Sequence, residues 1–310
     1  MTLTLSEKKV LTLLEQDARM PATKIAKLTN LSTEGVIKII KRLEENKILQ
    51  KFNLKINYSK MGYSLYPVHV KLIKMNPEII SRIKQTLVKY PSCTWYKFCE
   101  GEYDLLLSFK IKDSHGKKEM YSFLNEISDN ILEKEISIVL FAFEVGKSFT
   151  EKKSNKIFYT FDYKLEKTVL KKDEEELIIL LKKDSRESIL SLSKKLNLSP
   201  QIVSKKIKDL QKENIISGFK VSINTSKLEY QPCFALITLS NYKEEEIKSL
   251  ISYCQYTPGI NYLVRQMGKY DLELTIDAQN INDFYEIIDS LRKKFPIISK
   301  ISTLITKQNA

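Results

Sequence analysis

Hydrophobic positions recur with helical spacing inside the stretch Leu196–Phe219. Val203, Ile207 and Leu210 fall at i, i+4 and i+7, which places them on one face of a helix and leaves a polar, basic face opposite. Ser199 precedes them together with a proline, the expected N-cap and first helical residue. An apolar run upstream predicts a shorter helix, and Asn197 between the two helices tolerates the left-handed backbone of a tight turn. The pattern predicts a helix-turn-helix.

The same pattern occurs twice along the chain. At a shift of 167, residues 17–63 align with residues 184–230 without a gap, with 18 identities in 47 pairs. The match continues to Gly101-Glu102-Tyr103-Asp104-Leu105 and Gly268-Lys269-Tyr270-Asp271-Leu272, and the shift falls to 165 near the end. The chain therefore consists of two copies of one two-part module.

The first part of each module is expected to be a winged helix-turn-helix. In the first copy Ser6 is the expected cap of the first helix, Asn30 the turn and Ser32 the cap of the third helix. The run Ile48–Ile56 alternates apolar and polar residues, which predicts a pair of short strands forming a wing.

The second part of each module alternates strands and helices in the order βαββαβ, typical of a ferredoxin-like sheet with both helices on one face. The first copy has expected elements at residues 66–74, from 77, 94–99, 103–111, 118–131 and 135–143. The second has them at 233–240, 244–254, 262–266, 270–276, 282–295 and 298–305. The expected class is α+β. The expected domains are 1–62 and 173–229 (winged helix-turn-helix), 63–146 and 230–310 (ferredoxin-like effector and dimerisation domains), and 147–172 (a connector with a strand-like aromatic core).

The net charge of +13 is unevenly distributed. Residues 1–62 carry +6, 147–172 carry +5 and 173–229 carry +2, whereas 63–146 and 230–310 are neutral. The excess charge lies where a phosphate backbone would need it, which favours double-stranded DNA as a partner.

Other classes of protein are disfavoured by composition. No apolar run is long enough to cross a membrane, and the N-terminal MTLTLSEKK lacks a signal core, so we expect a cytoplasmic protein. The four cysteines and two histidines show neither disulfide nor zinc spacing. No catalytic set can be assembled from motifs, so we expect no cofactor, no metal and no enzymatic activity.

The candidate DNA-binding residues lie on the outward faces of the two predicted recognition helices. They are Thr33, Lys38, Lys41, Arg42, Gln201, Ser204, Lys205 and Lys208. The lysines and the arginine suit phosphate contacts, and Thr33, Gln201 and Ser204 occupy the start of the helix that reaches base edges.

These motifs resemble the Lrp/AsnC family of feast/famine transcription regulators, known in archaea and bacteria. The resemblance rests on Asp17-x-Arg19 and Asp184-x-Arg186, on Asn-Leu-Ser before each recognition helix, and on Gly-x-Tyr-Asp in each sheet domain. It implies a small-molecule effector such as an amino acid, bound near Gly101, Tyr103, Asp104, Gly268, Tyr270 and Asp271 at a contact between sheet domains. The chain departs from the family at the mid-helix arginine, which becomes Ile39 and Lys206.

The sequence thus predicts a sequence-specific DNA-binding transcriptional regulator. The sheet domains are expected to pair, as an intramolecular pseudo-dimer, in a homo-oligomer, or both. Two alternatives remain open at this point. One is a siroheme-decarboxylase-like enzyme of haem biosynthesis, and the other is a ligand-sensing co-regulator without DNA binding.

Overall fold

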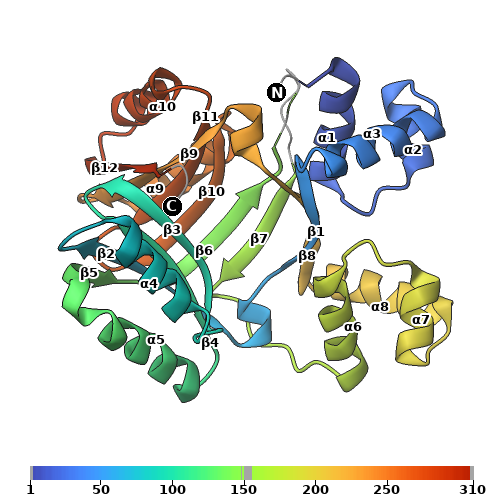
Figure 1. The fold of residues 1–310 in the computed structure, drawn as a ribbon, viewed down its shortest axis with the longest axis horizontal. Helices are drawn as coiled ribbons and strands as arrows, with labels where there is room; N and C mark the ends of the chain where they lie inside the picture. The colour runs from blue at the N-terminus through green and yellow to red at the C-terminus, as the bar shows by residue number, and fades with distance from the viewer. Residues whose placement is uncertain (1–2, 148, 150–155, 308–310) are drawn as a thin grey trace. The chain divides into compact units, whose positions relative to one another are not determined.

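The computed structural model describes residues 3–147, 149 and 156–307, and the described chain forms two compact units (Figure 1). Unit 1 comprises Met1–Met61, Phe143–Thr160 and Leu165–Tyr230, and unit 2 comprises Gly62–Ala142, Phe161–Lys164 and Gln231–Ala310. Each unit therefore combines equivalent parts of both copies of the repeat. The α+β class is confirmed, whereas the five domain ranges expected from the sequence stay a prediction.

Unit 1 contains a set of three helices from each copy (Figure 1). They are α1 (Leu5–Gln16), α2 (Ala22–Thr29), α3 (Thr33–Glu45), α6 (Lys172–Lys183), α7 (Ile189–Leu196) and α8 (Pro200–Lys212). Asn30 and Asn197 have left-handed φ values of 57° and 52°, which confirms the tight turns before α3 and α8. The expected cap at Ser6 is wrong, because Thr4 caps α1 in a reciprocal capping box with Glu7.

The wing predicted at Ile48–Ile56 is not a hairpin. It is one strand, β1 (Leu49–Ile56), and its partner is β8 (Ile216–Ile223) of the other copy. The antiparallel register places Phe52 opposite Val221 and Leu54 opposite Phe219. Within β1 no Gly or Pro allows a tight reversal, so the strand takes its hydrogen-bonding partner from the second copy.

One hydrophobic core runs through both copies in unit 1. It includes Val36, Ile40 and Leu43 of α3 together with the equivalent residues of α8, Val203, Ile207 and Leu210. The inward faces predicted from the helical spacing are therefore confirmed. Because this core is shared, the two helix sets of unit 1 are buried against a common interior.

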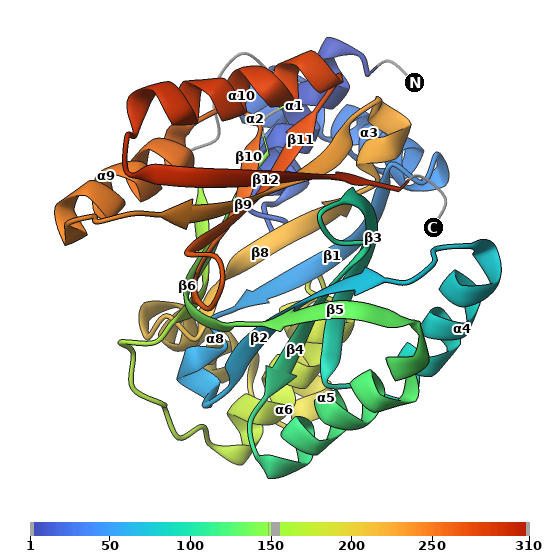
Figure 2. The same cartoon turned by 90° about the vertical axis from the view of Figure 1, so that its left-hand side faces the viewer.

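Unit 2 contains the two βαββαβ sequences (Figure 2). The first comprises β2 (Ser64–Leu72), α4 (Pro77–Leu87), β3 (Cys93–Gly101), β4 (Leu105–Ile111), α5 (Ser114–Glu126) and β5 (Ile131–Ile136). The second comprises β9 (Gln231–Leu239), α9 (Glu244–Tyr256), β10 (Ile260–Met267), β11 (Leu272–Ala278), α10 (Ile281–Lys294) and β12 (Ile298–Thr306). The strand orders β5-β2-β4-β3 and β12-β9-β11-β10 are equivalent, and both are ferredoxin-like.

The strand expected at 135–143 is in fact interrupted. Ser137 separates β5, which pairs with β2, from β6 (Ile138–Val145), which lies beside β10 of the second copy. In the second copy β12 pairs with β9, and its end pairs with β3 through Leu304 and Gly101. Each last strand therefore serves both sheets. The connector's predicted strand is β7 (Ile157–Asp162), next to β6, and residues 148 and 150–155 of the connector lie outside the described residues.

The sheets of unit 2 have a helical face and a face turned toward the other copy. Helices α4 and α5 cover a core that includes Val68, Val70, Phe109 and Phe123. A separate cluster joins the copies and consists of Cys99, Tyr103, Leu106, Phe234, Leu236, Tyr270 and Leu304. In the part of the chain that the structure describes, no helix combines the length and apolarity needed to span a membrane.

Candidate nucleic-acid interface

Helix α8 presents a continuous polar face. The Ser199 hydroxyl accepts the Ile202 N–H at 3.3 Å, and Pro200 occupies the first helical position. Gln201, Lys205 and Lys208 are exposed and Ser204 is half-buried. A shallow, open depression runs along this face and is lined by Pro200, Gln201, Ser204, Lys205, Lys208 and Asp209. The structure thus brings the four predicted residues of the second copy together on one surface.

Helix α3 presents the equivalent face with more of its charge neutralised. The Ser32 hydroxyl accepts the Gly35 N–H at 3.0 Å, so the predicted cap is confirmed. Thr33 is half-buried, and Lys38, Lys41 and Arg42 are exposed. Lys41 lies 3.7 Å from Glu45 one turn away. Among the described residues, no carboxylate lies within ion-pair distance of Lys38.

Arg42 differs from the other predicted contacts because it is held by its own domain. Its Nε donates to Glu7 Oε1 at 2.9 Å, and its Nη2 lies 2.5 Å from the same atom. Burial raises the pKa of Glu7, but hydrogen bonds from Thr4 and Arg42 outweigh burial and hold this pKa below its ordinary value. Arg42 therefore supports α1 in addition to facing solvent.

Lys206 stands where the family resemblance places an arginine, and it too is engaged. Its Nζ lies 2.8 Å from Asp173 and 3.5 Å from Glu174, both in the first turn of α6. By contrast, Lys205 and Lys208 have no carboxylate within ion-pair distance among the described residues. These two lysines are the cations of α8 best placed to meet phosphate.

The Asp-x-Arg motifs contribute to the contact between the two copies in unit 1. Arg19 lies over the ring of Phe219 at 5.3 Å, and Arg186 lies over the ring of Phe52 at 4.8 Å. Arg19 also donates to the Ser185 carbonyl at 2.6 Å, and Arg186 to the Met20 carbonyl at 3.4 Å. Since residues 19 and 186 are equivalent in the repeat, and so are 52 and 219, the contact is reciprocal.

Reasoning from the sequence missed this pairing role. Asp17 and Asp184 fix the motif locally, because each accepts the N–H of its arginine, at 2.9 and 2.8 Å. The signal available in the sequence was that both arginines and both phenylalanines are retained in the two copies. What the sequence could not show is that each arginine contacts the phenylalanine of the other copy.

A buried ion cluster lies on the local two-fold between β1 and β8. Lys220 pairs in register with Asn53, its own equivalent in the repeat, and is 2% exposed. Its Nζ lies 2.6 Å from Glu144 and 3.1 Å from Glu15. Burial lowers the pKa of Lys220, but the two carboxylates outweigh burial and raise it above its ordinary value. Burial likewise raises the pKa of Glu144, and the facing lysines reverse that effect and depress it strongly.

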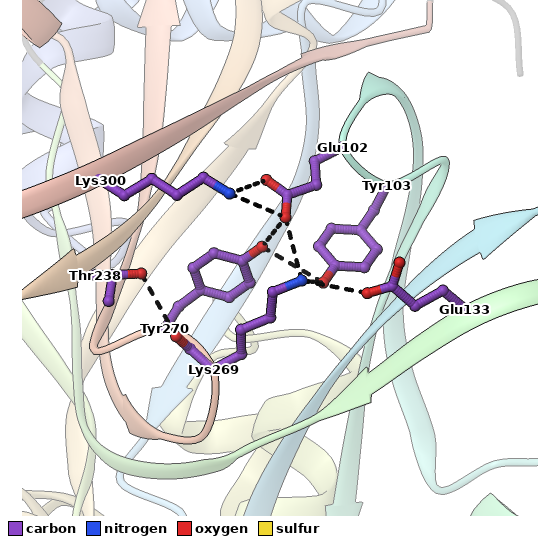
Figure 3. A network of polar contacts seen from close by, with 7 residues as sticks. All are labelled: Glu102, Tyr103, Glu133, Thr238, Lys269, Tyr270 and Lys300. Atoms are coloured by element: carbon purple, nitrogen blue, oxygen red, sulfur yellow. Dashed lines mark hydrogen bonds and ion pairs between the residues drawn. The ribbon is translucent and has the colours of Figure 1, made fainter.

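Two of the residues predicted to bind an effector, Tyr103 and Tyr270, lie at the contact between the two sheet domains (Figure 3). Tyr103 and Tyr270 are buried, and their hydroxyls are 3.4 Å apart. Asp104 accepts the Leu72 N–H at 2.9 Å, and Asp271 accepts the equivalent Leu239 N–H at 2.7 Å. These side chains are engaged in holding the sheets, and effector binding there stays a prediction.

The glycines of the same turns lie against the opposite copy. A Cβ on Gly101, which has φ +141°, would come 2.6 Å from the Thr303 carbonyl oxygen. A Cβ on Gly268 would overlap the hydroxyl of Ser137. The pairing of the sheets therefore places the tyrosine and the glycine of each turn against the other copy, whereas Asp104 and Asp271 bond within their own copies.

Comparison with known proteins agrees with this architecture. A family model described as winged helix-turn-helix DNA-binding matches residues 3–50 and 174–217. The HTH-type transcriptional regulator FL11 of Pyrococcus furiosus is 29% identical over 145 residues, which is 47% of this chain and 92% of the relative. The HTH-type transcriptional regulator LrpA of Pyrococcus abyssi is 30% identical over 116 residues, which is 37% of this chain and 81% of the relative. The chain belongs to the Lrp/AsnC family of transcriptional regulators.

The fold of this Lrp/AsnC chain is also similar to that of a solved enzyme. The match to the crystal structure of the siroheme decarboxylase NirDL spans 98% of this chain and 91% of the NirDL chain, with a TM-score of 0.65 and 11% sequence identity. This similarity shows a shared fold. The relatives identified by sequence, in contrast, are named as transcriptional regulators.

Proposed function

We propose that the chain is a sequence-specific DNA-binding transcriptional regulator in which α3 and α8 enter major grooves. The observation that carries this proposal is the face of α8, where Gln201, Ser204, Lys205 and Lys208 form an unblocked polar surface beside a capped helix start. Helices of this type read base edges with their first residues and contact phosphates with their lysines. The regulators FL11 and LrpA, to which the chain is similar, support the same function.

We further propose that the two modules act as an intramolecular pseudo-dimer. The reciprocal Arg19 and Arg186 contacts and the β1–β8 pairing support a fixed pair of recognition helices. Since α3 and α8 present different side chains, the preferred operator is an imperfect palindrome with unequal half-sites. A small molecule such as an amino acid, bound near the Gly-x-Tyr-Asp turns, would modulate this binding, and a thermal-shift screen of amino acids tests that part.

The affinity for DNA from upstream of the chain's own gene, titrated at several salt concentrations, tests the DNA-binding function. Lys205→Ala/Lys208→Ala should weaken binding and make the slope of log affinity against log salt shallower by about one unit per lysine. Lys293→Ala, an exposed lysine of α10, is the matched control and should leave the slope unchanged. Wild-type binding no tighter than to random DNA would contradict the proposal.

Siroheme decarboxylation is the second candidate, favoured by the fold shared with NirDL over nearly the whole chain. The arginines and histidines of the sheet domains do not favour it, because each of them is already engaged by a carboxylate. Arg82 binds Asp129, Arg265 binds Glu244, Arg292 binds Asp289, His69 binds Glu273 and His115 binds Glu119. A change in siroheme absorbance on mixing with the protein would favour the enzyme.

A further inference from the structure

Four charged side chains surround the Tyr103–Tyr270 contact, and their sign differs between the two copies (Figure 3). Glu102 and Glu133 belong to the first copy, and Lys269 and Lys300 belong to the second. Lys269 Nζ lies 3.2 Å from both Glu102 Oε1 and Glu133 Oε1. Lys300 Nζ lies 3.2 Å from Glu102 Oε2. We call these four side chains the pairing charges.

The pairing charges differ between the two copies, although the motif around them is the same in both. Glu102 and Lys269 are equivalent in the repeat, yet the glycine, tyrosine and aspartate beside them are identical in both copies. At the shift of 165, Lys300 is the equivalent of Glu135, so a second position has also changed sign. The turn has thus kept its structural residues and differs in the charge that faces the other copy.

A contact between two identical copies would set like charges against each other. Two first copies would bring Glu102 against glutamates, and two second copies would bring Lys269 against lysines. The side chains of Glu102 and Lys269 are 26% and 36% exposed, so water screens their interaction only in part. Tyrosine hydroxyls also join the network, with Tyr270 donating to Glu102 at 2.7 Å and Lys269 donating to Tyr103 at 2.9 Å.

Unit 1 contains a second charged contact between the copies. Near its local two-fold, Lys220 of the second copy pairs with Glu15 and Glu144 of the first, and Lys55 of the first copy also pairs with Glu144. The first-copy residue equivalent to Lys220 is the neutral Asn53. A pairing of two second copies would oppose two buried lysines there, at a large cost in free energy.

We propose that the pairing charges determine partner choice, so that a first-copy sheet domain pairs with a second-copy sheet domain and rejects another of its own kind. The surface around Glu102 and Glu133 fits a partner that carries lysines at the positions of Lys269 and Lys300. Sheet domains of single-module relatives that lack those lysines should not pair with this surface. This inference does not depend on DNA binding, because it concerns only how the copies pair.

Charge inversion in the full chain tests the proposal. Glu102→Lys/Glu133→Lys makes every pairing charge basic, and Lys269→Glu/Lys300→Glu makes every one acidic. Each half-inverted chain should melt at least about 5 °C below wild type at low salt, with a smaller difference near about 1 M salt. The four-fold inversion, which restores opposite signs, should regain most of the lost melting temperature.

The matched control inverts an ion pair within one copy, Arg82→Asp/Asp129→Arg, at side chains that are 51% and 60% exposed. It should change the melting temperature little. The proposal is overturned if the half-inverted chains melt like wild type, or if the four-fold inversion melts no higher than they do.

Partner choice itself is measured by refolding the all-acidic and all-basic chains together and counting dimers by native mass spectrometry. In an exchanged dimer, every sheet domain of one chain meets a sheet domain of opposite charge. Mixed dimers should therefore exceed the statistical proportion. A mixture with mixed dimers at or below that proportion, or with none, would count against the proposal.

Discussion

Individual side chains of the candidate interface divide into those free to meet DNA and those that hold the fold. Lys205 and Lys208 extend from α8 with no carboxylate within ion-pair distance among the described residues, whereas Arg42 of α3 is the partner of buried Glu7. Basic residues on the outward faces of the two recognition helices therefore perform different tasks in the two copies. This difference becomes visible only when the helix is placed against α1.

Replacing Arg42 should reveal its structural task. Arg42→Ala leaves the Glu7 carboxylate, 1% exposed, with only its bonds to Thr4, and should lower the free energy of unfolding by about 1–3 kcal/mol. Lys41→Ala, on the exposed side of the same helix, should change it by about 0.5 kcal/mol or less. Urea unfolding measures both. Equal stabilities with weaker DNA binding only for Arg42→Ala would assign the arginine to DNA instead.

His69 and Glu273 form a buried polar pair between the copies. The His69 Nε2 lies 3.0 Å from the Glu273 carboxylate, and Tyr103 and Tyr270 pack beside the imidazole. At the equivalent positions across the local two-fold the chain has Leu236 and Leu106, both buried in the same cluster. One contact thus exists in a polar and an apolar version within one molecule.

This duplication predicts a non-additive pair of substitutions. His69→Leu or Glu273→Leu alone leaves a buried polar group without its partner and should cost about 1–3 kcal/mol. The double substitution reproduces the leucine pair of the other side and should lie within about 1 kcal/mol of wild type. A double-mutant cycle by chemical denaturation checks this. Simple addition of the two single losses would show that the pair is not coupled.

Among the elements, the recognition helices were predictable because their signals are local. Ser32 and Ser199 cap the helix that follows within a few residues, and Asn30 and Asn197 form the turns by their own backbone preference. The sharing of strands was not predictable in this way. Nothing near Leu49 indicates that its strand would pair with a strand more than 150 residues along the chain.

The candidate effector site, too, could be predicted only in part from the sequence. The repeat identified the Gly-x-Tyr-Asp turns, but not that their side chains hold the two sheets together. A usable signal was nevertheless present, because Glu102 and Lys269 differ in sign inside an otherwise retained motif. Opposite charges at equivalent repeat positions indicate a contact on or near a two-fold axis.

The β3–β12 junction depends on the absence of a side chain at Gly101. Gly101→Ala introduces a Cβ against the Thr303 carbonyl at a backbone φ of +141°, and should cost about 1–3 kcal/mol. Gly116→Ala on α5, where the new Cβ would lie 3.3 Å from Ile111, gains helix propensity and should change stability much less. Thermal unfolding compares the two. If the Gly101→Ala chain is as stable as the Gly116→Ala chain, the β3–β12 junction can accommodate the added Cβ.

At the scale of the whole molecule, the equivalent surfaces of the two modules differ in charge. The net charge is +6 over residues 1–62 and +2 over residues 173–229, yet the unblocked pair of lysines lies on α8 of the less basic segment. We therefore expect the second copy to contact DNA more strongly, although its segment carries less net charge. The pairing of each lysine with its neighbours is more informative.

Selection of binding sites from random DNA should reveal this inequality. The enriched site should be an imperfect palindrome, and Gln201→Ala/Ser204→Ala, at the base-reading positions of α8, should relax one half-site while leaving the other enriched. Lys38→Ala/Lys41→Ala should leave the selected sequence unchanged and lower the affinity less than Lys205→Ala/Lys208→Ala does, because Glu45 already offsets Lys41. A perfectly symmetric optimum from the wild-type chain would contradict the proposed division between the copies.

The strands shared in unit 2 have a mechanical consequence. Beyond Ser137 the chain continues without a loop from β5, in one sheet, into β6 beside the other, and the end of β12 returns the contact to β3. Load applied to one sheet is therefore carried by backbone ladders directly into its neighbour. We therefore expect the paired sheets to move as one rigid body. Rotation of one sheet relative to the other would require hydrogen bonds between the shared strands to break.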